Sequence, residues 1–191
     1  VLLRGQTRAT DAARIVCGTE PAAHFACGCN IGMGSRVAAF ANANRRFFGD
    51  AAGTALGLLL AIRRHRRFTA RRDVDGAAFA LEETSHIFIL KNPFIASGLR
   101  LDLPRSPDDG QLTVLALHHL SRAALLRMLP SFYSGQAVHH PSVFRRDGRS
   151  VTLATDPAQA VEFDGDPRGE TPVSVELLPR ALTLICEVSH A

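Results

Sequence analysis

Helical periodicity is clearest in residues 45–66. Apolar residues recur there three or four positions apart, which places them on one face of a helix; they are Phe48, Ala51, Ala52, Ala55, Leu58, Leu59 and Ile62. Gly53 and Gly57, four positions apart, allow a close approach to this face. The pattern predicts one long helix that packs against a sheet or forms a wall of a lipid-tail pocket.

Most of the remaining chain has the pattern of β-strands. Residues 86–91 form a nearly continuous apolar run, which is typical of a fully buried strand. Asp-Gly pairs at positions 75–76, 147–148 and 164–165 supply the positive-φ residues that tight turns need. The predicted strands are residues 11–16, 24–31, 68–74, 77–81, 86–91, 111–117, 143–146, 150–154, 160–163, 173–177 and 181–187.

A second, short helix is predicted at residues 121–129, with Ser121 as its N-cap and Pro130 as its end. Short strands separated by turns, without β-α-β alternation, exclude a Rossmann domain and predict a mainly β fold. We expect a two-sheet antiparallel β-sandwich with one long and one short inserted helix, forming a single domain over residues 1–191. The strand at 11–16 is expected to be entered from elsewhere, with its hydrogen-bond partner missing from this chain, and the Val1 start indicates a piece of a longer polypeptide.

Charge adds one feature to this picture. The net charge is +4 and comes from arginine, because Lys91 is the only lysine. The densest run is Arg63-Arg64-His65-Arg66-Arg67, followed by Arg71-Arg72. It is interpreted as a solvent-facing helix C-terminus, or alternatively as a patch for anionic lipid or nucleic acid. The absence of interleaved aromatic residues argues against nucleic acid.

The cysteines at 17, 27, 29 and 186 lack zinc-site spacing and are interpreted as buried thiols in a reducing, cytoplasmic compartment. The pairs His118-His119 and His139-His140 are poor chelates, because adjacent strand residues point to opposite faces. The longest apolar run, residues 51–62, is too short to span a bilayer. Neither a nucleophile elbow nor a Gly-rich phosphate loop is present, and the lone Gly32-Met-Gly34 is weak as a phosphate-binding motif.

Two acidic turns are the candidate sites. Residues 161–172 form a predicted hairpin with Asp164-Gly165-Asp166 at its tip, where a carboxylate can project toward a partner. Residues 106–111 form a turn that offers carbonyl and carboxylate oxygens, the ligands that Mg²⁺ or Ca²⁺ prefers. These residues alone leave two interpretations open for each turn: a purely structural turn, or a site that takes part in catalysis or metal binding.

The order of short motifs along the chain resembles the C-terminal domain of the diacylglycerol kinase and bacterial lipid kinase family, which is related to sphingosine and ceramide kinases. The motifs are Phe25-Ala-Cys-Gly-Cys-Asn-Ile-Gly32, Gly49-Asp50-Ala51, Asn92, Gly98, Leu103-Pro104, Asp109-Gly-Gln-Leu-Thr-Val114, Gly135-Gln-Ala-Val-His139 with Pro141, Asp164-Gly165-Asp166, and Leu178-Pro179 with Ala181-Leu182. The family's Gly-Gly-Asp-Gly-Thr nucleotide loop is missing. The resemblance therefore implies the C-terminal β-sandwich domain of a lipid kinase whose nucleotide-binding domain is absent from this chain.

The resemblance also implies roles for individual residues. The family's Asp-Gly-Glu corresponds to Asp164-Gly165-Asp166, so Asp166 and Asp164 are the expected catalytic residues, and Asp164 and Gly165 are expected beside ATP. Its structural Mg²⁺ maps onto Asp109 and the carbonyls of Ser106 and Gln111. Its lipid-facing region maps onto Gly34, Ser35, Arg36, Leu56 and Leu59. The side chain of Asp166 is one methylene shorter than that of the family's Glu, and the rate of proton transfer depends on the distance between the carboxylate and the hydroxyl group.

The leading hypothesis is the substrate-binding and partly catalytic domain of an ATP-dependent, diacylglycerol-like lipid kinase, inactive when isolated. Its expected partners are a lipid substrate, ATP with Mg²⁺ and the membrane surface, to which it binds peripherally, but not nucleic acid; homodimer formation is left open. The alternative is a non-catalytic β-sandwich module that binds a lipid or a protein. A third hypothesis, a nucleic-acid binder that uses the arginine run, predicts a steep salt dependence of binding.

Overall fold

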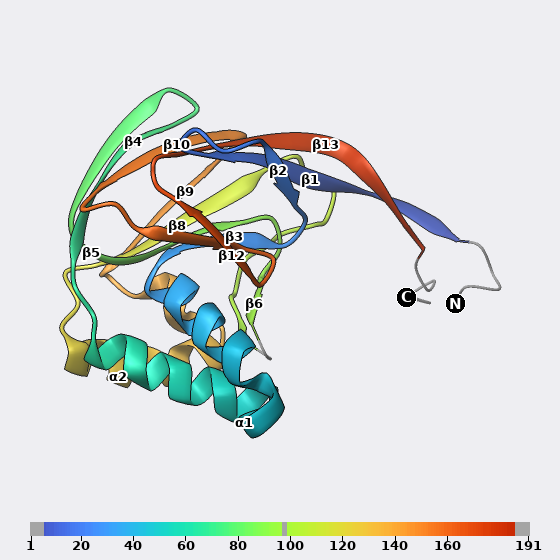
Figure 1. Ribbon diagram of the computed structural model, residues 1–191. Coiled ribbons are helices and arrows are strands. Elements are labelled where there is room, and N and C mark those ends of the chain that lie inside the picture. Colours follow the sequence, from blue (N-terminus) through green and yellow to red (C-terminus); the bar gives the residue numbers. More distant parts are fainter. Residues whose placement is uncertain (1–5, 97–98, 186–191) are drawn as a thin grey trace.

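Eleven strands join into one curled antiparallel sheet in the computed structural model, which describes residues 6–96 and 99–185 (Figure 1). The strand order is β12-β11-β3-β5-β4-β10-β13-β1-β2, with β8 paired to β5 and β9 paired to β8. A separate hairpin is formed by β6 (Phe94–Ala96) and β7 (Leu99–Arg100). The sheet strands are β1 (Thr7–Cys17), β2 (Ala23–Phe25), β3 (Gly28–Gly32), β4 (Phe68–Val74), β5 (Ala77–Leu90), β8 (Leu112–His118), β9 (Val143–Gly148), β10 (Ser150–Asp156), β11 (Ala160–Phe163), β12 (Asp166–Glu170) and β13 (Val173–Ile185).

The predicted mainly β fold is confirmed, and its two layers are parts of a single sheet. Strand β5 connects them, because its first half pairs with β4 and its second half pairs with β3 and β8. The two strands predicted at 77–81 and 86–91 are therefore one strand, as are those at 173–177 and 181–187. Conversely, the strand predicted at 24–31 is divided into β2 and β3.

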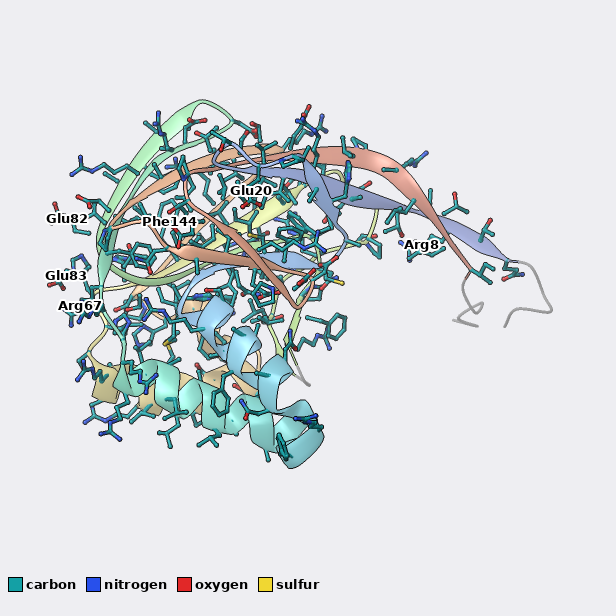
Figure 2. All side chains as sticks on the ribbon, in the orientation of Figure 1. Arg8, Glu20, Arg67, Glu82, Glu83 and Phe144 are labelled. Atoms are coloured by element: carbon teal, nitrogen blue, oxygen red, sulfur yellow. The ribbon has the colours of Figure 1, made fainter. Side chains whose placement is uncertain are left out.

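The expectation that the strand at 11–16 lacks a partner in this chain is wrong, because β1 has two partner strands. Strand β1 pairs with β13 along its whole length and with β2 near its C-terminal end. Beyond the curled sheet, β1 and β13 continue together as a two-stranded arm (Figure 1). Arg8 lies on this arm (Figure 2).

Alternation along the central strands builds two cores on opposite faces of the sheet. On β5, Ile87 and Ile89 point into the core enclosed by the curled sheet, whereas Phe88 and Leu90 point to the face that the helices cover. The same alternation on β8 sends Val114 to the first core and its neighbour Leu115 to the second. Because side chains of a strand alternate between faces, a strand between two apolar layers carries a continuous apolar run.

Two helices cover that second face (Figure 1). Helix α1 (Met33–Arg63) begins well before the predicted start at Arg45 and consists of two helical arms that meet at a sharp kink (Figure 1). The kink is at Gly49, whose φ of 70° and ψ of 178° are not helical, so the prediction of one uninterrupted long helix is wrong. Small residues dominate its first turns, so hydrophobic periodicity is weak there although the segment is helical. No helix within the described residues has the length and apolar character required to cross a membrane.

Helix α2 (Arg122–Tyr133) begins at the predicted cap: the Ser121 hydroxyl accepts the Ala124 N–H at 3.1 Å. The predicted end at Pro130 is wrong, since the helix continues to Tyr133. Proline lacks the N–H that would bond four residues back, but burial of Leu125 and Met128 against the second core holds the helix in place.

Candidate functional site

A cavity of about 590 Å³ lies between the two helices and the sheet face formed by β3, β5 and β11. Most of its wall is apolar and comes from helix positions at four-residue spacing and from every second residue of the strands. The apolar lining consists of Met33, Val37, Ala38, Ala41, Leu58, Ile62, Phe88, Leu90, Ile95, Leu117, Leu125, Leu129 and Phe132. Phe94 and Tyr133 also border the cavity and are 61% and 67% exposed, so it opens to solvent beside them.

One part of the cavity wall is polar, and Glu162 is its central residue. Its side chain is only 4% exposed, although it is a carboxylate on a strand whose neighbours are Val161 and Phe163. Glu162 accepts hydrogen bonds from the Asn30 side-chain amide and the Gly165 N–H, each at 2.5 Å. Burial raises the pKa of Glu162, and the nearby charge of Asp164 acts in the same direction.

His86 continues this polar group behind Asn30. Its Nδ1 accepts the Gly34 N–H at 3.1 Å, so its proton is on Nε2, which donates to Asn30 Oδ1 at 3.3 Å. Burial lowers the pKa of His86 to about 3, and the ring is therefore neutral at physiological pH. The hydrogen-bonded side chains of His86, Asn30 and Glu162 thus form a row across three adjacent strands, β5, β3 and β11, on one face of the sheet.

The acidic hairpin tip forms the edge of this polar wall. Asp164 has a positive φ of 49° and its carboxylate accepts the N–H groups of Ala26, Cys27 and Gly28 at 2.7, 2.9 and 3.1 Å. Asn42 of α1 donates to the Gly165 carbonyl at 2.8 Å, so the tip is attached to the helix as well. Asp164 thus connects the hairpin to the segment before β3.

Asp166 differs from Asp164 in its surroundings. Its side chain is 56% exposed, bonded to Arg168 Nε at 2.7 Å, and does not line the cavity, whereas Asp164 and Gly165 do. The turn therefore brings all three predicted residues to one tip but directs the side chains of the two aspartates to different places. The catalytic role of Asp164 and Asp166 stays a prediction.

Of the five predicted lipid-facing residues, only one lines the cavity. Gly34 lines the cavity. Ser35 is buried with its hydroxyl donating to the Gly32 carbonyl at 2.7 Å, and Arg36 is exposed. Leu59 is 54% exposed and Leu56 does not line the cavity.

The side of α1 that lines the cavity instead carries Thr54, Leu58 and Ile62. Sequence reasoning identified the right helix, but it chose neighbours of these residues and missed the polar residues Asn30 and Glu162. The available signal was alternation: each lies on a strand between two core residues and so points to the opposite face.

The turn expected to hold Mg²⁺ contains a buried ammonium group. Lys91 Nζ lies 2.6 Å from Asp109 Oδ1 and 3.0 Å from the Ser106 carbonyl oxygen. The other Asp109 oxygen accepts from the Ser106 N–H at 3.2 Å and from Arg105 at 3.3 Å. Burial acts to raise the pKa of Asp109, but the hydrogen bond from Lys91, backbone N–H groups and the lysine charge lower it. In this arrangement Ser106 and Asp109 do not fit a metal ion, since their oxygens already face cationic and N–H donors.

The arginine run and the cysteines differ in their exposure to solvent. Arg63, Arg64 and Arg66 are exposed, as a solvent-facing helix end requires, and Arg67 pairs with Glu83 at 2.8 Å (Figure 2). Cys17 and Cys29 are buried thiols, but Cys27 is exposed and lines the cavity. In residues 6–96 and 99–185, no three His, Cys, Asp or Glu side chains gather as a metal site. Gly98 and Cys186 lie outside the described residues.

Solved structures share this fold. One, titled "Crystal structure of a putative diacylglycerol kinase from Bacillus anthracis str. Sterne", superposes with a TM-score of 0.68 at 17% identity, over 95% of this chain and 57% of that chain. Another, titled "A putative diacylglycerol kinase from Bacillus anthracis str. Sterne", gives a TM-score of 0.63 at 16% identity, over 95% and 58% of the two chains. At such identities the likeness concerns the fold alone.

Sequence comparison identifies the family. "Putative lipid kinase SAB0675c" of Staphylococcus aureus (strain bovine RF122 / ET3-1) is 30% identical over 126 residues, which are 62% of this chain and 39% of that protein. The chain thus spans well under half the length of this curated relative. Residues 28–186 match the family described as the YegS C-terminal NAD kinase beta sandwich-like domain. Since this match covers most of the chain, the protein belongs to that family, the C-terminal domains of the diacylglycerol kinase and lipid kinase group.

Proposed function

We propose that this chain is the substrate-binding and partly catalytic domain of an ATP-dependent lipid kinase that phosphorylates the hydroxyl group of a diacylglycerol-like lipid. The observation that carries the proposal is the cavity itself, which is apolar along its helices and acidic at the hairpin tip. A diacylglycerol has the same division, with acyl chains on one side and a hydroxyl group on the other. The names of the relatives agree with this chemistry but describe those proteins.

The apolar part of the cavity is suited to acyl chains. Its volume of about 590 Å³ lies within the range of small-molecule sites, and aliphatic and aromatic side chains form most of its wall. The opening beside Phe94 and Tyr133 carries large exposed apolar groups. In the proposal the acyl chains enter here from the membrane surface, to which the protein binds peripherally.

The hydroxyl group then lies at the acidic tip. Asp164 is engaged by three backbone N–H groups, and Glu162 by two donors, so hydrogen bonds within the domain hold both carboxylates in place. Asp166 is bonded only to the exposed Arg168. We assign it the role of accepting the hydroxyl proton during attack on the γ-phosphate, with ATP and its Mg²⁺ held mainly by a separate nucleotide-binding domain.

Two leucines that are adjacent in sequence test lipid binding. Leu58 lines the cavity and Leu59 is exposed on the same helix turn. In the full-length protein, Leu58→Trp should fill the cavity and raise KM for diacylglycerol about tenfold or more, with KM for ATP unchanged. Leu59→Trp, the matched control, should leave both unchanged. Equal effects of the two substitutions would contradict lipid binding in this cavity.

The catalytic assignment has its own test. Asp166→Asn should reduce kcat by a factor of about 10²–10⁴ without changing KM for lipid or the melting temperature. Glu170→Gln, on the same exposed strand, is the control and should keep normal turnover. Near-normal turnover of Asp166→Asn would mean that the turn is only structural. The isolated chain should show no turnover, and appreciable activity would refute the division between two domains.

The alternative function is a non-catalytic module that binds a lipid or a protein partner. It shares the cavity but not the chemistry. A full-length protein that binds diacylglycerol, is sensitive to Leu58→Trp and transfers no phosphate from ATP would establish it.

A further inference from the structure

Lys91 is the only lysine of the chain, and its side chain is 1% exposed. Transferring an ammonium group from water into a protein interior is unfavourable unless oppositely charged or polar groups surround it. Lys91 directly follows β5, at the point where three segments that are distant in sequence meet. These are β1 with Asp11, the end of β5, and the turn at residues 106–111.

Three oxygen atoms surround the ammonium nitrogen. Asp109 Oδ1 lies at 2.6 Å, the Ser106 carbonyl oxygen at 3.0 Å and Asp11 Oδ2 at 3.3 Å. The oxygens of Asp109 and Ser106 accept hydrogen bonds from the ammonium group, and the Asp11 carboxylate forms a salt bridge with it. Two of the oxygens belong to carboxylates and one to a backbone carbonyl, which is also the donor chemistry of a hard divalent cation.

The surrounding residues complete the hydrogen bonding of both carboxylates. Asp11 is 0% exposed and accepts the N–H groups of Gly110 and Arg180, each at 2.9 Å. On the other side, Arg105 bridges Asp109 and Asp147. Negative and positive side chains therefore alternate from Asp11 through Lys91, Asp109 and Arg105 to Asp147. Without the ammonium group, Asp11 and Asp109 would face each other as like charges across a buried gap.

We propose that the Lys91 ammonium group is a covalently attached replacement for the structural divalent cation that the family resemblance assigns to Ser106, Asp109 and Gln111. It holds the 106–111 turn against β1 by the same electrostatic attraction that a metal ion would supply. The turn therefore keeps its conformation without Mg²⁺ or Ca²⁺. The converse also follows: shortening Lys91 leaves a space lined by two carboxylates and a carbonyl, and such a space binds a divalent cation. This inference does not rest on the proposed kinase activity.

Thermal unfolding with and without metal tests the replacement. In the full-length protein without nucleotide, the wild-type melting temperature should be the same in excess EDTA and in excess Mg²⁺ or Ca²⁺. Lys91→Ala should melt lower in EDTA and recover by about 5–10 °C when Ca²⁺ is present at roughly a hundred times its Kd. Lys91→Met, which fills the space without a charge, should melt lower and show no recovery.

A double variant that also changes Asp109 tests where the metal ion binds. Lys91→Ala combined with Asp109→Asn should lose the recovery by Ca²⁺. If Lys91→Ala and Lys91→Met respond equally to Ca²⁺, the proposal is wrong. Should Lys91→Ala fail to fold, calorimetric titration of the wild-type protein with Ca²⁺ decides the matter: binding that Asp109→Asn abolishes would overturn the replacement, and its absence would support it.

Discussion

The two aspartates of the hairpin tip have different hydrogen-bond partners, and substitution by alanine should separate their effects on stability. Asp164 accepts three backbone N–H groups that belong to residues 26–28. Asp166 has one partner, the exposed Arg168. We therefore expect Asp164→Ala to destabilise the fold and Asp166→Ala to leave it nearly unchanged.

The size of the loss in the free energy of unfolding depends on how accessible the three hydrogen bonds are to water. A hydrogen bond to a charged group contributes about 1.5–3 kcal/mol where no water can replace it. The N–H groups of Ala26 and Cys27 bond to Asp164 at an exposed position, so water can replace much of their loss, whereas the bond from Gly28 is partly buried. The φ of 49° at Asp164 adds roughly 1 kcal/mol, because aspartate tolerates the left-handed region better than alanine. The expected loss is about 2–4 kcal/mol.

Urea unfolding followed by circular dichroism measures this difference in the free energy of unfolding. The control, Asp166→Ala, removes a surface ion pair and should cost about 0–1 kcal/mol. Asp164→Asn keeps the left-handed preference and one acceptor oxygen, so it should fall between the two. A loss below about 1 kcal/mol for Asp164→Ala, or equal losses at positions 164 and 166, would refute the reasoning.

Two further predictions concern the polar wall of the cavity. A Cβ at Gly34 would lie 2.5 Å from Cε1 of the buried His86, so Gly34→Ala should destabilise the protein by about 1–3 kcal/mol in urea unfolding. Gly53→Ala is the control, because a Cβ at Gly53 would have no neighbour nearer than 3.9 Å. It should stabilise α1 by about 0.5–1 kcal/mol. The reverse order would contradict the close contact. Because burial raises the pKa of Glu162, its contribution to stability is present below the unfolded pKa and is lost as the pH rises through the folded pKa. The free energy of unfolding of the wild type relative to Glu162→Gln should therefore fall as the pH rises above 4.5, the ordinary pKa of a glutamate, and a difference independent of pH would exclude a buried, titrating carboxylate.

Local sequence determined those elements whose signals lie within a few residues. Strands β4 and β11 have the predicted bounds, and Ser121 caps its helix, because alternation, Asp-Gly turns and capping side chains act over short distances. The mainly β class follows from the same signals. The motif order then indicated the family.

Tertiary structure decided which faces are covered and therefore what the site is. Alternation shows that Asn30 and Glu162 point away from one core, but only the packing of α1 and α2 encloses that face and turns it into a cavity wall. The choice between Leu58 and Leu59 likewise depends on the rotation of α1 against the sheet. Lys91 could not be matched from sequence with Asp11, eighty positions away, because such a contact depends on how β1, β5 and the 106–111 turn meet in space.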